Sequence, residues 1–168
     1  MSGPPGSGKS TLAEELAPAL GLPLFAKDTI KHALMEVLGA PDVAASRRLG
    51  TASVATLLAV AAANGRGVLE SVWHRSYAIP DLRALPGPIV EVFCSCDRDV
   101  VESRYRARAT IRAAGHFDGQ RRAEELWNDE VAVPVAGGWP VIEVDTEGPV
   151  DVPDLAQRVR AAALRHGT

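Results

Sequence analysis

Residues 3–10 read Gly-Pro-Pro-Gly-Ser-Gly-Lys-Ser, which matches the pattern G-x-x-x-x-G-K-S of a phosphate-binding Walker A loop. Glycines at these spacings let successive backbone N–H groups face phosphate oxygens, and a helix that follows adds the positive end of its dipole. Lys9 should reach the β- and γ-phosphates, and the Ser10 hydroxyl should ligate Mg²⁺. The predicted nucleotide contacts are Gly3, Pro4, Pro5, Gly6, Ser7, Gly8, Lys9, Ser10 and Thr11. The expected cofactors are ATP, with GTP as the alternative, and Mg²⁺.

The segments on the two sides of this loop differ in how well they suit such a site. After the loop, leucines recur at helical spacing and a glycine supplies a stop signal, so we expect a helix over 10–20. Before the loop, a central strand of about five residues is usual, yet only Met1 and Ser2 precede Gly3. Either the chain as given starts too late or the loop is held without that strand, and we favour the first interpretation.

The rest of the chain alternates apolar runs with helical patterns, which favours an α/β fold with a parallel sheet flanked by helices. The predicted strands are 23–26, 67–73, 89–96 and 141–145. The further predicted helices are 28–38, 41–64, 97–114, 120–131 and 153–166. Asp28 and Asp42 are suitable N-caps for the first two of these helices. Together with the Walker A loop, the order predicts a P-loop NTPase, similar to nucleoside monophosphate kinases.

Two carboxylates are candidates for chemistry. Asp28 follows a predicted strand at the edge where ligands bind in open α/β sheets, and Lys31 lies one helical turn later. Asp28 could accept the proton of an acceptor hydroxyl while Lys31 neutralises the transferring oxygens. A plain helix cap beside a solvated lysine is the alternative. Glu70 lies inside an apolar strand, where an unpaired charge is costly, so we interpret it as a magnesium or substrate contact or as half of an ion pair.

Arginines mark a candidate lid over residues 104–122. Arg104, Arg108 and Arg112 are four residues apart and therefore share one face of a helix. The planar guanidinium binds phosphate oxygens bidentately and can stabilise charge on the transferring group. We expect Arg104 and Arg108 to act in catalysis and Arg112 to bind the nucleotide; a solvated charged face is the alternative.

An aromatic group follows the strand that holds Glu70. Trp73, His74 and Tyr77 come at the predicted ligand edge and could wall the acceptor site, although for Trp73 alone we favour ordinary core packing. The segment 116–118 at the presumed lid tip has no spacing typical of a metal site or of a nucleophile with its base.

Composition limits the class of protein. The formal net charge of −3 gives no general attraction to nucleic acid or to anionic membranes. Cys94 and Cys96 lie two apart in a predicted strand, which suits reduced, buried thiols better than a disulfide. We find no signal peptide and no apolar run of about 18 residues. We therefore expect a cytoplasmic protein with one domain over residues 1–168.

With these residues in view, the whole chain resembles the small P-loop kinases grouped with chloramphenicol phosphotransferase, zeta toxin, gluconate kinase and the kinase domain of polynucleotide kinase. The resemblance implies that Asp28, in LFAKDTIKHAL, is the base toward the acceptor hydroxyl and that Lys31 is a basic active-site residue. It also implies a lid arginine, Arg104 or Arg108, and a contact to the nucleotide base within 145–148. The group often has Asp where this chain has Glu70, which leaves the metal role of Glu70 open.

Three functions fit the sequence. The first is an ATP-dependent phosphotransferase that moves the γ-phosphoryl group to a hydroxyl of a small molecule, with Asp28 as general base. The second is a polynucleotide 5′-hydroxyl kinase, supported by the clustered arginines between residues 98 and 122. The third is a nucleotide-binding switch that has no acceptor. The sequence leaves the acceptor, the choice between ATP and GTP, and the oligomeric state undetermined.

Overall fold

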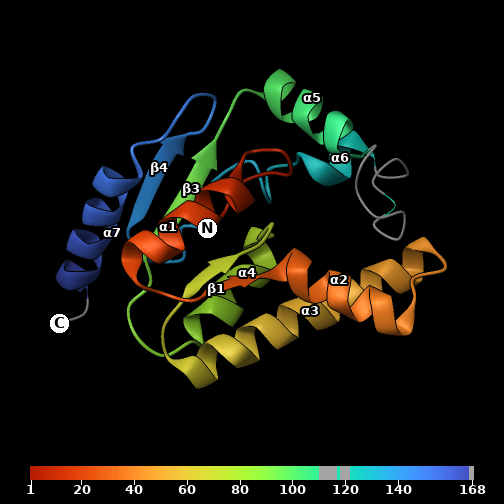
Figure 1. Ribbon diagram of the computed structural model, residues 1–168, viewed down its shortest axis with the longest axis horizontal. Coiled ribbons are helices and arrows are strands. Elements are labelled where there is room, and N and C mark those ends of the chain that lie inside the picture. Colours follow the sequence, from red (N-terminus) through yellow and green to blue (C-terminus); the bar gives the residue numbers. More distant parts are fainter. Residues whose placement is uncertain (110–116, 118–121, 167–168) are drawn as a thin grey trace.

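The computed structural model describes residues 1–109, 117 and 122–166, and within these its strands form two parallel pairs (Figure 1). One pair joins β1 (Leu24–Ala26) to β2 (Val68–Glu70). The other joins β3 (Glu91–Ser95) to β4 (Val141–Asp145). The predicted parallel sheet is therefore confirmed, but it is divided into two halves.

A two-residue segment lies between the halves. Ser2 forms an isolated parallel bridge with Phe93, donating its N–H to Val92 O at 2.9 Å, while Cys94 donates its N–H to Ser2 O at 3.0 Å. On the other side, the Met1 nitrogen donates to Leu69 O at 2.9 Å. The strand order is thus β1, β2, Met1–Ser2, β3, β4. Met1 and Ser2 thus occupy the position between β2 and β3 where the strand before a Walker A loop is expected.

Helices pack against both halves of the sheet. Their bounds are α1 (Lys9–Leu20), α2 (Lys27–Leu38), α3 (Val43–Asn64), α4 (Arg75–Arg83), α5 (Arg98–Ala109), α6 (Ala123–Leu126) and α7 (Val152–His166). Leu16 of α1 and Leu155 of α7 pack with Val92 and Val144 in one core cluster beside β3 and β4. Figure 1 shows α2, α3 and α4 grouped around β1 instead. None of the described helices is long and apolar enough to span a membrane.

Capping residues explain where the helices begin. Asp42 starts α3 as predicted, because its side chain accepts the Ala45 N–H at 2.6 Å. The prediction that Asp28 caps α2 is wrong, because Ala26 is the N-cap and Asp28 lies in the first turn. A carboxylate in the first turn is still favoured by the helix dipole.

Other predicted elements differ in length. The strand predicted over 67–73 is only β2, and the helix predicted over 120–131 shortens to α6. Helix α4 was not predicted, because Pro80 lies inside it and proline normally argues against a helix interior. The expected lid over 104–122 falls largely outside the described residues.

Candidate active site

The Walker A loop runs from the Met1–Ser2 segment into α1 and is anchored by two side chains from distant parts of the chain. The hydroxyl oxygen of Thr146, just after β4, lies 2.7 Å from Ser7 O and 2.8 Å from Ser95 O, so its single proton is shared between these two carbonyl oxygens. Trp127 donates its indole N–H to Pro5 O at 3.0 Å. Sequence reasoning missed both anchors, since neither belongs to a motif. Thr146 fixes the loop backbone to the β3–β4 half of the sheet, and Trp127 fixes it to the segment after α6.

The glycines of the loop are required by its surroundings. Gly6 has a φ of 89°, and a Cβ there would overlap the backbone carbonyl of Val101 in α5. Gly3 has a φ of 130°, and its Cβ would lie 2.6 Å from Cys94 O. Both residues combine a left-handed backbone with close approach of another chain segment, which only glycine tolerates. At these two positions the loop therefore presents backbone groups and no side chain.

Lys9 and Ser10 lie where the loop meets the β1–β2 half of the sheet. Lys9 is 5% exposed and its Nζ donates to Pro4 O at 3.1 Å. Burial lowers the pKa of Lys9, and the nearby Glu70 carboxylate partly opposes this. Ser10 donates its hydroxyl to Glu70 Oε1 at 3.3 Å. The structure thus brings together the two side chains that we predicted as magnesium ligands, although their binding of a metal stays a prediction.

The residues present suit a nucleotide with Mg²⁺. Ser7 Oγ and Arg108 Nε are buried polar atoms for which the described residues supply no hydrogen-bond partner, and both could donate to phosphate oxygens. Ser10 and Glu70 offer the oxygen ligands that Mg²⁺ prefers. No group of three or more His, Cys, Asp or Glu side chains in the described part is arranged to hold a metal. Phosphate oxygens would therefore have to complete the magnesium shell.

A cavity of about 750 Å³ opens beside the loop. Lys9 and Ser10 of α1 line it together with Asp28 and Lys31 of α2. Trp73, His74 and Tyr77 also line it, so the predicted aromatic group does reach the site. Trp73 is buried and Tyr77 is 76% exposed, which leaves Trp73 with a core role as well.

The candidate base Asp28 and the nearby Lys31 differ in their exposure and in their contacts. Asp28 forms an ion pair with Lys27 at 2.9 Å and its side chain is 41% exposed, so a ligand can reach it. Lys31 is buried and donates to Ser46 Oγ of α3 at 2.7 Å. Lys31 therefore ties α2 to α3 in the structure; its predicted contact to the transferring group stays a prediction.

The three lid arginines do not share one environment. Arg104 donates to Thr146 O at 3.0 Å and to Glu147 O at 3.1 Å, which fastens α5 to the segment after β4. Arg108 lines the cavity and stacks on Tyr105, with its guanidinium carbon 5.7 Å from the ring centre. Arg112 lies outside the described residues. Of the two described arginines, Arg108 is thus the one placed at the cavity.

Comparison with known proteins connects this geometry to a family. A sequence model of the AAA domain matches residues 1–132. Among solved structures, a "putative kinase" from Chloroflexus aurantiacus is 30% identical, with 96% of this chain and 95% of that chain covered and a TM-score of 0.85. A sugar kinase from a Janibacter species is 21% identical (99% and 95% covered, TM-score 0.59). A gluconokinase from Sinorhizobium meliloti is also 21% identical (98% and 89% covered, TM-score 0.55). A comparison with curated proteins finds no match.

Proposed function

This chain belongs to the AAA-domain family and has the fold of a P-loop NTPase, and from this premise we propose that it is an ATP-dependent kinase of a small hydroxylated molecule. One observation carries the proposal. The phosphate-binding residues Lys9 and Ser10 line the same cavity as the candidate base Asp28. A nucleotide-binding module without an acceptor has no need for a second, base-bearing wall opposite its phosphates.

The residues divide the reaction between them. Lys9 and the loop N–H groups would hold the β- and γ-phosphates, and Ser10 with Glu70 would hold Mg²⁺, which neutralises phosphate charge when bound. Asp28 would accept the proton of the acceptor hydroxyl as the bond from that oxygen to the γ-phosphorus forms and the bond to the β-phosphate oxygen breaks. Arg108 would donate to the transferring group, and this contact would give its buried Nε a hydrogen-bond partner.

The cavity supports a compact polar acceptor. Besides Asp28, its walls carry the hydroxyl groups of Ser46 and Thr51 and the side chains of His74 and Asp81. Side chains that both donate and accept hydrogen bonds suit a molecule with several hydroxyls. The similar structures named as a sugar kinase and a gluconokinase agree with this chemistry. We propose a sugar-like acceptor.

A polynucleotide acceptor has less support. Two of the clustered arginines, Arg98 and Arg106, are paired with Glu102 at 2.9 and 2.7 Å. Arg104 is engaged by backbone carbonyls. These contacts reduce the positive charge that the described part of the cluster could offer to a nucleic-acid backbone.

The test is transfer of the γ-phosphoryl group from ATP with Mg²⁺ to a panel of sugars, sugar acids, nucleosides, antibiotics and 5′-hydroxyl oligonucleotides. Wild type is compared with Asp28→Asn and with Asp154→Asn, a carboxylate on α7 outside the cavity. We expect one class of acceptor to be phosphorylated. Asp28→Asn should lower kcat by about 100-fold or more, as loss of a general base does, and should leave nucleotide affinity within about 3-fold.

Three results would contradict the proposal in different ways. Undiminished transfer in Asp28→Asn would remove Asp28 from its role and leave the kinase intact. Nucleotide binding without transfer to any acceptor of the panel would favour the switch without an acceptor. Transfer to oligonucleotides alone, with a steep dependence on salt, would favour the polynucleotide kinase.

A further inference from the structure

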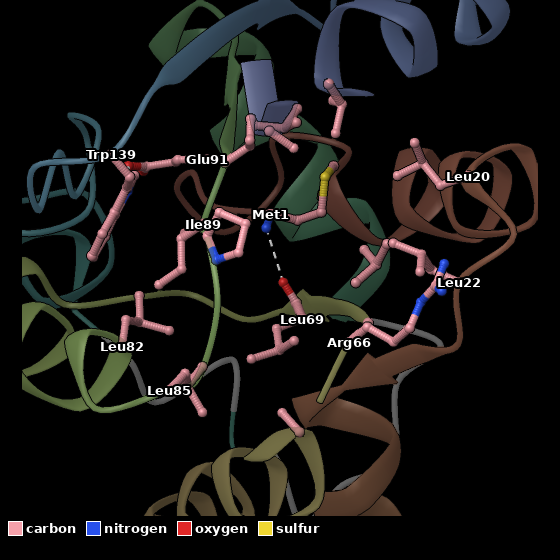
Figure 2. Close-up of a pocket in the computed structure, with 18 of the residues that line it drawn as sticks. Met1, Leu20, Leu22, Arg66, Leu69, Leu82, Leu85, Ile89, Glu91 and Trp139 are labelled. Carbon is pink, nitrogen blue, oxygen red and sulfur yellow. Dashed lines mark hydrogen bonds between the residues drawn. The ribbon is translucent and has the colours of Figure 1, made fainter. Parts of the chain in front are cut away.

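A smaller cavity, of about 230 Å³, differs in character from the one that holds the candidate base (Figure 2). Figure 2 shows Leu82 and Ile89 among the apolar side chains around it. Its carboxylate, Glu91, already accepts four hydrogen bonds from the protein. The larger cavity, with Asp28 in its wall, is therefore the one whose remaining lining residues bear on the choice of acceptor.

Gly50 is a lining residue of the larger cavity that stands where another residue would suit the helix better. It lies in the interior of α3, and within the described part of the chain no other glycine lies inside a helix. Glycine is less favourable than alanine in a helix interior, because it loses more backbone freedom on folding. The presence of Gly50 therefore needs a reason other than secondary structure.

The described residues show no packing or backbone requirement for this glycine. Gly50 is not among the residues with a positive φ. A Cβ built on it would meet no atom of the described residues within 4 Å, apart from its chain neighbours and the backbone of its own helix. Gly3 and Gly6 differ, because a Cβ there would overlap the backbone of another segment. The fold as described thus permits a side chain at position 50.

The open space beside Gly50 belongs to the cavity of about 750 Å³. Ser46, Gly50 and Val54 are four residues apart, so they share one face of α3, and all three line the cavity. One turn before Gly50, Ser46 Oγ accepts the hydrogen bond from Lys31 of α2. One turn after it, Val54 packs against an apolar core cluster. Between these two side chains the wall of the cavity is helix backbone alone.

Building on the proposed kinase function, we propose that Gly50 determines specificity for the acceptor, because its missing side chain leaves room for the body of that molecule. The N–H and C=O groups of a helix interior are bonded within the helix, so the surface at Gly50 presents Cα hydrogens. Such a surface suits the C–H face of a sugar ring or a similarly flat polyol. Ser46 and Thr51 beside it carry hydroxyl groups that can bind those of the ring, while the reacting hydroxyl is held at Asp28.

The experiment compares wild type with Gly50→Ala, Gly50→Leu and Ala52→Leu. Ala52 is exposed on the same helix and does not line the cavity, so it controls for added side-chain volume on α3. The acceptor probe is the sugar or sugar acid that wild type phosphorylates most efficiently in the panel described above. The acceptor KM, the affinity for ATP and Tm are measured on each protein.

We expect Gly50→Leu to raise the acceptor KM by about 10-fold or more, because the side chain takes the place of part of the acceptor. Its affinity for ATP should stay within about 3-fold of wild type. Gly50→Ala should raise the acceptor KM by about 3-fold or more. The same variant should raise Tm by roughly 2–4 °C, since alanine favours the helix. Ala52→Leu should keep the acceptor KM within about 2-fold of wild type.

Three results would overturn the role of Gly50 alone. The first is an unchanged acceptor KM in Gly50→Leu or, if that variant does not fold, in Gly50→Ala. The second is a lower Tm in Gly50→Ala, since the fold itself would then require the glycine. The third is an equal loss of ATP affinity and acceptor affinity in Gly50→Leu, which would assign the residue to the shape of the whole site. Wild type that phosphorylates no acceptor of the panel would instead overturn the proposed function, and the role of Gly50 with it.

Discussion

Glu91 offers the sharpest test of how the segment before the Walker A loop is held. It is 5% exposed at the start of β3. Its Oε1 accepts the Ser2 hydroxyl at 2.6 Å and the Val135 N–H at 2.7 Å. Its Oε2 accepts the Ala136 N–H at 2.8 Å and the Trp139 indole N–H at 3.0 Å. One carboxylate therefore joins the segment before the Walker A loop to the connection that leads into β4.

The substitution Glu91→Gln keeps the shape and removes half of this acceptor capacity. One carboxylate oxygen becomes an NH₂ group, which cannot accept and faces two donors. A hydrogen bond to a charged group contributes about 1.5–3 kcal/mol, and each buried donor left unpaired costs about 1–3 kcal/mol. Because these costs overlap, we expect a loss of about 3–5 kcal/mol in the free energy of unfolding, a large fraction of the roughly 5–15 kcal/mol typical of a domain.

Urea unfolding and thermal melts measure this loss. At about 2–4 °C per kcal/mol for a chain of this size, Tm should fall by roughly 6–20 °C. The matched control is Glu143→Gln, an exposed glutamate in the neighbouring strand β4, which should stay within about 0.5 kcal/mol of wild type. Equal stability of the two variants would refute the argument that the four contacts to Glu91 hold the Met1–Ser2 segment and the connection into β4 against β3.

Three further predictions concern single groups. Lys9→Met should lower turnover by about 100-fold or more, since a preorganised cation at the phosphates is removed; turnover within 3-fold of wild type would contradict it. The folded pKa of the Met1 ammonium lies below its usual value of 8.0. At a pH between the lowered pKa of the folded state and the usual value, the unfolded chain binds more protons than the folded chain. The free energy of unfolding should therefore rise with pH up to about 8. Nα-acetylated protein should lack this rise. Identical dependence of the unfolding free energy on pH in the acetylated and unacetylated proteins would contradict the prediction. Burial raises the pKa of Cys94 to about 11, so iodoacetamide at pH 8 should label Cys96 and spare Cys94 as long as the protein is folded, which peptide mass mapping can check.

Much of the fold was predictable because its signals are local. The Walker A spacing and the leucines after it placed α1 within one residue, and β4 has its predicted bounds. Asp42 was identified as a cap because capping needs only its own side chain and an N–H three residues later. The same rule misplaced Asp28, because a strand that passes directly into a helix lets Ala26 take the cap position.

Long-range contacts could not be predicted in the same way. Periodicity put Arg104 and Arg108 on one helix face but could not show that the Thr146 and Glu147 carbonyls hold Arg104. Thr146 and Trp127 support the loop from more than 100 residues away. Glu91 is different, because the sequence did contain a signal that could have identified it. A glutamate inside an apolar strand was the reason to select Glu70, and the same reasoning applies to Glu91.

The two halves of the sheet carry different parts of the proposed reaction. The loop is anchored to the β3–β4 half through Thr146, whereas Asp28 and Glu70 belong to the β1–β2 half. The distance from the phosphates to the base therefore depends on how firmly the halves are joined, and in-line transfer is sensitive to displacements of about 1 Å.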